Sequence, residues 1–316
     1  MSKKEKVIVI IGPTAVGKTK LSIELAKRVN GEIISGDSMQ IYKGMDIGTA
    51  KIKEEEMKGI PHHLIDIKEP TESFSVAEFQ ELVRPLISDI IKRGKMPMIV
   101  GGTGLYIQSV LYDYQFSETE RNQELRLKLE KKANEIGPIA LHEELMKIDP
   151  ISAKKIHPNN VRRVIRALEI FYDTGMKMSE MHENAEEEML YDALLIGLTV
   201  RRDILYDRIN QRVDLMIEEG LIPEVKRLYQ EGIRDCQSIQ AIGYKELYEH
   251  FDGNISIEEA IQKLKQNSRR YAKRQLTWFR NKMDVEWFDM TPPVPFETRL
   301  EEIFHYIEGK FCLKEN

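Results

Sequence analysis

Cysteine is scarce in this sequence, and long apolar runs are missing. Only two cysteines, Cys236 and Cys312, occur among the 316 residues, which excludes a disulfide framework and a cysteine-rich zinc site. No apolar stretch approaches the roughly 20 residues that a membrane-spanning helix needs. The apolar run that follows the basic N-terminus, 7–11, is too short for a signal peptide. We therefore expect a soluble, cytoplasmic protein that does not associate with membranes.

Acidic residues are absent from two long segments, although the whole chain carries a net charge of −5. Segment 262–282 contains eight basic residues, and segment 151–168 contains five. Tyr271, Trp278 and Phe279 are interleaved with the basic residues of the first segment. Cations bind phosphates, and extruded bases stack on aromatic rings or guanidinium planes. Segment 262–282 is therefore a candidate RNA-binding helix, with a solvated amphipathic helix as the alternative.

The first third of the chain alternates between strand and helix patterns. Short runs of apolar residues predict buried strands at 7–11, 32–34, 63–67 and 97–100. Helical spacing of apolar residues predicts helices at 19–29 and 76–93. Strands that are separated by helices indicate an α/β fold with a parallel sheet covered on both faces.

Segment 12–19 matches the phosphate-binding pattern G-x-x-x-x-G-K-[ST] and lies between a predicted strand and a predicted helix. Its glycines let backbone N–H groups surround an anion, and the helix N-terminus adds a favourable dipole. Lys18 supplies a point charge, and Thr19 can bind Mg²⁺. We expect a bound diphosphate or triphosphate here, held by Gly12, Pro13, Thr14, Ala15, Val16, Gly17, Lys18 and Thr19.

The middle of the chain differs from the first third. Segment 114–191 is charged, lacks a convincing strand pattern and is divided by prolines into short helical stretches. Strand patterns return at 193–200 and 285–288. We therefore expect an inserted all-helical domain at 114–191, within a P-loop NTPase-like core formed by 1–113 and 192–316.

Four further residues are candidates for chemistry. Asp37 follows the second predicted strand, at the edge that lines ligand crevices in open α/β sheets. Its carboxylate could bind Mg²⁺, act as a general base or only form a turn. Thr103 lies in a glycine-rich turn after strand 97–100, on the same edge. Arg208 and Arg212 share one face of a predicted helix, either as solvated surface or as a second anion clamp.

Six sequence blocks, taken in order, resemble bacterial tRNA dimethylallyltransferases, also called tRNA isopentenyltransferases. The blocks are GPTAVGKT, SGDSMQIYKGMDIGTAK, GGTGLY, NNVRRVIRALE, QAIGYKEL and RRYAKRQLTWFRN. They span nearly the whole chain, and DSMQIYKGMDIGTAK is far more specific than the P-loop pattern. The resemblance implies transfer of a dimethylallyl group from dimethylallyl diphosphate to the exocyclic N6 amine of adenosine 37 in tRNA, with Mg²⁺ assisting.

The resemblance also implies roles for individual residues. Asp37 would be the general base, and Thr103 would line the reaction channel. The P-loop and Arg212 would hold the diphosphate of the prenyl donor rather than ATP. Contacts with the anticodon stem-loop of tRNA are expected at Asp37, Ser38, Met39, Gln40, Arg126, Asn159, Asn160, Val161, Arg162, Arg163, Gln240, Ala241, Ile242, Gly243, Tyr244, Lys245, Arg270, Lys273 and Arg274. We expect the enzyme to act as a monomer.

Two other functions fit parts of the sequence. A P-loop small-molecule kinase could use the helical insert as a lid, although a lid does not need an acid-free basic segment with aromatic residues. A non-catalytic RNA-binding module would not need the intact Gly17-Lys18-Thr19. The fate of a label placed on dimethylallyl diphosphate or on ATP distinguishes these functions.

Overall fold

The computed structural model describes residues 4–114, 122–183 and 188–312. The chain forms two compact units, one made of Met1–Leu111 with Met189–Asn316, the other of Tyr112–Glu188. No helix within the described ranges is both long and apolar enough to cross a membrane.

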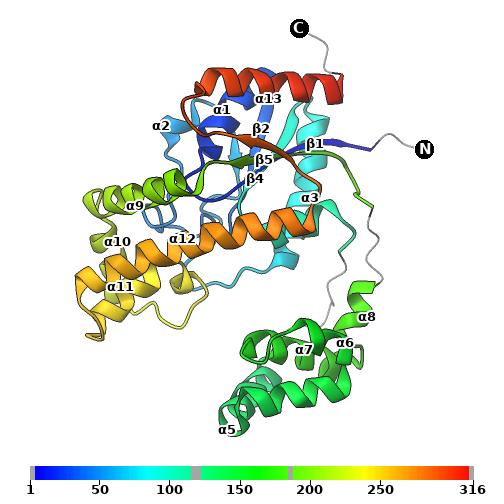
Figure 1. The fold of residues 1–316 in the computed structure, drawn as a ribbon, viewed down its shortest axis with the longest axis vertical. Coiled ribbons are helices and arrows are strands. Elements are labelled where there is room, and N and C mark those ends of the chain that lie inside the picture. Colours follow the sequence, from blue (N-terminus) through cyan, green and yellow to red (C-terminus); the bar gives the residue numbers. More distant parts are fainter. Residues whose placement is uncertain (1–3, 115–121, 184–187, 313–316) are drawn as a thin grey trace. The chain divides into compact units, whose positions relative to one another are not determined.

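The first unit is built on one six-stranded sheet, and all its strand pairs are parallel (Figure 1). The strand order is β3-β2-β4-β1-β5-β6. The strands are β1 (Lys6–Ile11), β2 (Gly31–Gly36), β3 (His62–His63), β4 (Met96–Gly101), β5 (Asp192–Thr199) and β6 (Glu286–Asp289). The predicted α/β fold is therefore confirmed.

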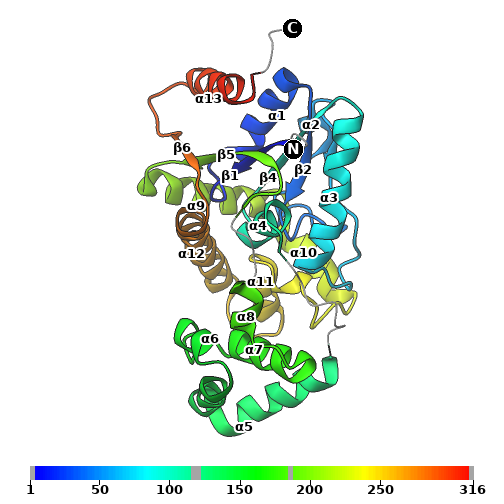
Figure 2. The ribbon, with the colours of Figure 1, turned by 90° about the vertical axis from the view of Figure 1, so that its right-hand side faces the viewer.

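Helices cover both faces of this sheet (Figure 2). Helices α1 (Lys18–Val29) and α13 (Phe296–Phe311) pack on one face, and α3 (Val76–Lys92) and α4 (Gly104–Leu111) pack on the other. The remaining helices of this unit are α2 (Glu54–Met57), α9 (Arg202–Glu218), α10 (Leu221–Gln230), η1 (Ser238–Gln240), α11 (Tyr244–Phe251) and α12 (Ile257–Lys282).

The central strand β1 forms the middle of the apolar core. All residues from Val7 to Ile11 are fully buried, as expected for a strand covered on both faces. Ile8 and Ile10 pack in one cluster with Leu21 of α1 and Ile303 of α13. Because β1 is held on both sides, the loop that leaves its carboxyl end starts from a fixed position.

The third strand is shorter than the sequence predicts. A strand was expected at 63–67, but pairing with β2 involves only His62 and His63. Leu64 and Asp66 adopt positive φ angles of 63° and 54°, which are incompatible with an extended strand. His63 instead forms a hydrogen bond through Nε2 to Glu32 Oε2 at 2.7 Å, so its role here is structural.

The regular elements of the second unit, within its described residues, are all helices. It contains α5 (Gln123–Ile148), which is broken at Gly137, and α6 (Pro150–Lys155), α7 (Val161–Thr174) and α8 (Met178–Glu183). The buried Asp149 carboxylate accepts hydrogen bonds from Ser152 N (3.0 Å), Ser179 N (3.0 Å) and Ser179 Oγ (2.8 Å). Burial opposes ionisation, but these bonds hold the pKa of Asp149 below its usual value. One carboxylate therefore ties α6 to α8.

Strands β2 and β4 approach so closely at their carboxyl ends that only glycine fits. A Cβ atom at Gly101 would lie 2.4 Å from the carbonyl oxygen of Gly36. We predict that Gly101→Ala lowers the free energy of unfolding by about 1–3 kcal/mol, because neighbouring backbone atoms leave no room for the methyl group. Chemical denaturation measures this change.

Gly309→Ala is the matched control. Nothing lies within 4 Å of a Cβ at this position in α13. Alanine should therefore stabilise the helix by about 0.5–1 kcal/mol. Equal stability of the two variants would contradict the close approach of β2 and β4.

Candidate functional site

The P-loop connects β1 to α1, and its backbone carbonyls form hydrogen bonds with the Lys18 side chain. Gly17, with φ of 106°, caps α1 in a conformation that side chains disfavour. Lys18 Nζ donates hydrogen bonds to Gly12 O at 2.9 Å and Pro13 O at 2.8 Å. These two carbonyls keep the ammonium group inside the loop, where an anion bound to the backbone amides would meet it.

A second cation, Arg212 of α9, lies beside the P-loop. Its guanidinium donates a hydrogen bond to Thr14 Oγ1 at 3.4 Å, and burial lowers the pKa of Arg212. Burial and the neighbouring Arg212 also lower the pKa of Lys18 to about 8, against an opposing effect of Asp37. Two partly buried cations therefore lie near one carboxylate, which makes the site suited to an anion.

Asp37 lies directly after β2. Its Oδ1 accepts a hydrogen bond from Met39 N at 2.8 Å, which fixes the side chain in an Asx turn. Among the described residues no group donates to Oδ2, so this oxygen is available to accept a proton. The sequence left open whether Asp37 only forms a turn. It does form a turn, and this turn holds the Asp37 carboxylate in place while leaving Oδ2 available.

Gln275 of α12 joins two loops that the sequence shows as separate motifs. Its Oε1 accepts a hydrogen bond from Thr14 N at 3.1 Å, and its Nε2 donates to Gly102 O at 3.1 Å. A Cβ at Gly102 would lie 2.0 Å from Nε2, and a Cβ at Gly104 would lie 2.1 Å from the Trp278 ring. The glycines after β4 are therefore required by close packing against α12.

Thr103 lies between these glycines. Its Oγ1 is buried beside the Tyr271 phenol and makes no hydrogen bond of good geometry within the described part of the chain. Burial, together with the nearby Asp37, raises the pKa of Tyr271 to about 12, so this phenol stays protonated. Sequence reasoning considered Tyr271 only as a stacking aromatic and gave Gln275 no role, because neither lies in a recognisable catalytic pattern.

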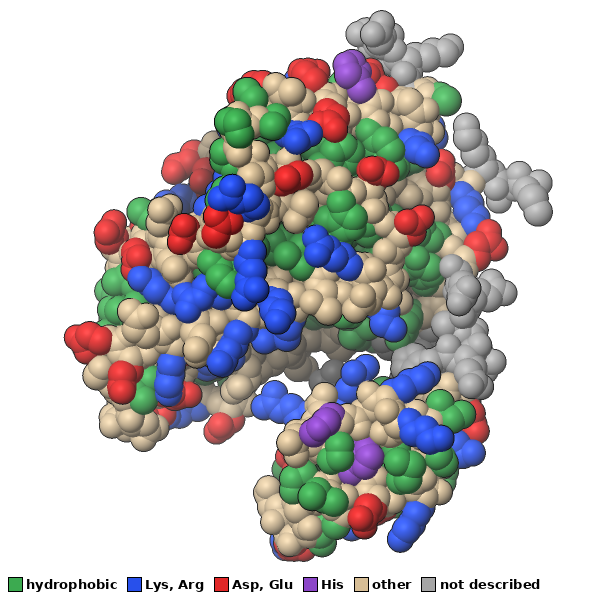
Figure 3. All heavy atoms as spheres, in the orientation of Figure 1, with side chains coloured by type: hydrophobic (Ala, Val, Ile, Leu, Met, Phe, Trp, Pro, Cys, Tyr) green, Lys and Arg blue, Asp and Glu red, His purple; other side chains and the backbone are tan. Residues whose placement is uncertain are grey.

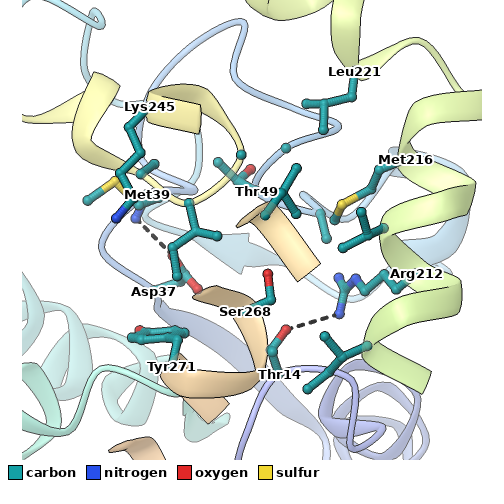
Figure 4. Close-up of a pocket in the computed structure, with 18 of the residues that line it drawn as sticks. Thr14, Asp37, Met39, Thr49, Arg212, Met216, Leu221, Lys245, Ser268 and Tyr271 are labelled. Atoms are coloured by element: carbon teal, nitrogen blue, oxygen red, sulfur yellow. Dashed lines mark hydrogen bonds between the residues drawn. The ribbon is translucent and has the colours of Figure 1, made fainter. Parts of the chain in front are cut away.

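Two adjoining cavities meet at Asp37. The P-loop cavity has a volume of about 560 Å³ and includes Lys18, Thr19 and Gln275. The other, here called the apolar cavity, has a volume of about 300 Å³. Its apolar lining includes Met216 and Leu221 (Figure 4), together with Ile209, Val213 and Leu264. Both cavities share Thr14, Asp37, Thr49, Ala50, Arg212 and Tyr271.

All residues of the DSMQ and QAIGYK motifs except Tyr244 line at least one of the two cavities. The apolar cavity is lined by Ser38, Met39, Gln240, Ala241, Ile242, Gly243 and Lys245. Gln40 lines the P-loop cavity, and its Nε2 donates to Thr49 O at 3.3 Å. Tyr244, expected to contact RNA, is fully buried and donates its hydroxyl to Glu224 Oε1 at 2.6 Å. Its side chain lines neither cavity and packs behind the cavity wall.

Five of the eight basic residues of α12 fall into two groups. Lys263 pairs with Glu249 at 2.8 Å and Lys265 with Asp214 at 2.6 Å, so carboxylates from neighbouring helices neutralise them. The other group is exposed and has no carboxylate partner among the described residues: Arg270, Lys273 and Arg274. Lysine and arginine side chains gather on the face that carries α9 and α12 (Figure 3).

The exposed cations do not all face the same cavity. Arg274 lines the apolar cavity, and its guanidinium lies 5.7 Å from the centre of the Tyr271 ring. Lys273 lines a separate cavity of about 330 Å³ with Arg202 and Arg280. The structure therefore associates Arg274 with the site and Lys273 with the adjoining surface.

Several predicted RNA contacts lie in the helical unit. Asn160 caps α7, and Val161 begins it. Asn159, Arg162 and Arg163 are exposed there. Arg126 forms ion pairs with Glu130 at 3.0 Å and Glu169 at 3.7 Å, so its charge is already partly compensated.

The P-loop cavity contains oxygen donors suitable for Mg²⁺. Thr19, at the start of α1, and Asp37 both line it. The described residues include no cluster of three His, Cys, Asp or Glu that could hold a metal by itself. Because Mg²⁺ usually takes few protein ligands and completes its shell with phosphates and water, this donor set fits Mg²⁺ that binds together with a diphosphate.

A family model and several relatives match this chain over most or nearly all of its length. The family model described as IPP transferase matches residues 40–282. The tRNA dimethylallyltransferase of Anoxybacillus flavithermus is 67% identical over 99% of both chains. That of Bacillus subtilis is 64% identical over 98% of this chain and 99% of the relative.

Solved structures give the same family. A tRNA isopentenylpyrophosphate transferase from Bacillus halodurans is 59% identical, with a TM-score of 0.74 over 98% of this chain and 97% of that chain. A eukaryotic dimethylallyltransferase acting on tRNA is 34% identical, with a TM-score of 0.84 over 98% of this chain and 79% of that chain.

The lowered pKa of Lys18 predicts how anion binding depends on pH. Lysine loses its charge as the pH rises through its pKa, which is about 8 here. Affinity for an organic diphosphate should therefore fall by about tenfold between pH 7 and pH 9. Calorimetric titration at several pH values measures this affinity.

Lys18→Ala provides the control. This variant should bind weakly, with a change of less than about twofold over the same pH range, because the titrating group is gone. A wild-type affinity that does not vary with pH would contradict a role for the Lys18 ammonium in anion binding.

Proposed function

Because the chain belongs to the IPP transferase family, we propose that it transfers the dimethylallyl group of dimethylallyl diphosphate to the N6 amine of adenosine 37 in tRNA. Its high-identity relatives are named tRNA dimethylallyltransferases, so it is a prenyltransferase acting on tRNA rather than a kinase. The observation that carries the proposal is the meeting of two cavities at Asp37, one built for an anion and one apolar.

The donor is held by charge at one end. The P-loop amides, Lys18 and Arg212 hold the diphosphate, and their charges stabilise it as it leaves. Mg²⁺, when bound through the Thr19 hydroxyl and phosphate oxygens, would further neutralise the diphosphate charge. The allylic carbon then lies near the junction of the two cavities.

The acceptor enters from the apolar cavity. A base in the anticodon stem-loop leaves its stack so that its amine reaches the buried carbon. The C–N bond forms as the C–O bond breaks, diphosphate leaves with the bonding electrons, and Asp37 Oδ2 takes the proton from the amine. The carboxylate is held ready for this by the hydrogen bond from Met39 N to Oδ1.

Exposed cations would hold the rest of the stem-loop. Arg270, Lys273 and Arg274 of α12 offer positive charge without a carboxylate partner in the described structure. The start of α7 in the helical unit, with Arg162 and Arg163, offers a second basic surface. All these groups belong to one chain, so we expect the monomer to be active.

Substitution of Asp37 tests the proposed chemistry. Asp37→Asn preserves the size of the side chain but removes the base, so kcat should fall by about 10²- to 10⁴-fold. Affinity for tRNA should change by less than about threefold, because charge on other residues positions the RNA. Single-turnover transfer and filter binding measure the two quantities. A variant that retains more than half of wild-type turnover would remove Asp37 from the mechanism.

The unpaired cations of α12 predict a salt effect on tRNA binding. Arg270→Ala with Arg274→Ala should flatten the plot of log affinity against log salt concentration by about one to two units. Lys263→Ala with Lys265→Ala is the control, because these lysines are already paired with carboxylates and should leave the slope nearly unchanged. The proposed RNA surface would be wrong if both pairs of substitutions had the same effect.

A further inference from the structure

Glu224 of α10 accepts hydrogen bonds from three consecutive backbone amides in the loop 45–50. Its Oε2 accepts from Asp46 N at 3.0 Å and Ile47 N at 2.8 Å. Its Oε1 accepts from Gly48 N at 3.1 Å. Bonds from backbone amides to a carboxylate are stronger than those between neutral groups. One side chain therefore fixes the path of three residues that lie more than 170 positions earlier.

Tyr244 of α11 forms a further hydrogen bond to the Glu224 carboxylate. Its hydroxyl donates to Glu224 Oε1 at 2.6 Å, and burial with the nearby Glu224 raises the pKa of Tyr244, so it remains a donor. The ring packs directly on the loop, because a Cβ at Gly48 would lie 2.5 Å from it. The loop is thus held both by the Glu224 carboxylate and by an aromatic surface.

The loop fixed in this way forms part of the site. Gly48, Thr49 and Ala50 line the apolar cavity, and so do Gln240–Gly243, which lead into Tyr244. From the other side, Gln40 Nε2 donates to Thr49 O and Ala50 O, each at 3.3 Å. Glu224 therefore connects two walls of the cavity without lining it.

We propose that Glu224 is a positioning residue, which holds the loop 45–50 in the place that the tRNA nucleotide requires. This inference rests on the proposed function, in which the acceptor base enters the apolar cavity. The bonds from this loop to Glu224 come from Asp46, Ile47 and Gly48, of which Gly48 lines the apolar cavity and none lines the P-loop cavity, so the diphosphate of the donor should depend on Glu224 much less than the tRNA nucleotide does. Its loss should therefore weaken use of tRNA selectively.

Glu224→Gln provides the main test. The amide keeps the size of the side chain but replaces one acceptor oxygen by a donor NH₂, which faces backbone N–H groups. The KM for tRNA should rise by about tenfold, which corresponds to losing one or two net hydrogen bonds. The KM for dimethylallyl diphosphate should stay within about twofold of wild type. Amide hydrogen exchange at 46–48 should become faster, while exchange in α1 should not change.

Two further variants separate positioning from stability. Tyr244→Phe removes one buried hydrogen bond but leaves the three amide bonds to Glu224 and the ring packing. It should lower the melting temperature as Glu224→Gln does, yet leave the KM for tRNA within about twofold of wild type. Glu249→Gln, at an exposed ion pair with Lys263, should change neither quantity.

The outcomes are distinguishable. A selective rise in the KM for tRNA with Glu224→Gln, absent in Tyr244→Phe, supports the inference. If Glu224→Gln and Tyr244→Phe both lose stability and neither changes the KM for tRNA, Glu224 is only structural and the inference is wrong. Transfer by the wild-type chain is measured first, because its absence would remove the proposed function itself, whereas an unchanged KM would remove only the role of Glu224.

Discussion

The site depends on two cations, Lys18 and Arg212, that the fold partly buries beside a single carboxylate, Asp37. Burial is unfavourable for both charges, and it lowers the pKa of each. A bound diphosphate would supply the missing negative charge. The fold therefore carries an electrostatic cost that a bound diphosphate would offset.

The parallel sheet and one long helix bring the site together. The loops after β1, β2 and β4 leave the same edge of the sheet, which places the P-loop, Asp37 and Thr103 next to one another. Helix α12 then crosses these loops and contributes Tyr271 and Gln275. Its outer surface carries cations that have no carboxylate partner among the described residues, so in the proposed function one helix would both order the anion site and offer charge to RNA.

Sequence reasoning identified features that short segments encode, and it missed contacts between residues that are far apart in the chain. The P-loop and the strand and helix pattern of the core could be predicted because short segments encode them. The Gln275 bridge links positions 173 residues apart, and Glu224 shows no motif, so neither could be recognised from spacing. The strand expected at 63–67 was too long, because positive φ angles at Leu64 and Asp66 end it. The acid-free segment 262–282 obtains carboxylates from other helices, Asp214 and Glu249, which its own composition does not reveal.

The most direct test of the account is the fate of the allyl group. The chain is incubated with unmodified tRNA and dimethylallyl diphosphate labelled in its carbon skeleton, and the tRNA is then digested to nucleosides. The account predicts label only on the N6 position of adenosine 37, with one diphosphate released for each group transferred and no requirement for ATP. Label that remains in the donor, together with transfer of the γ-phosphate of ATP to a small molecule, would contradict it.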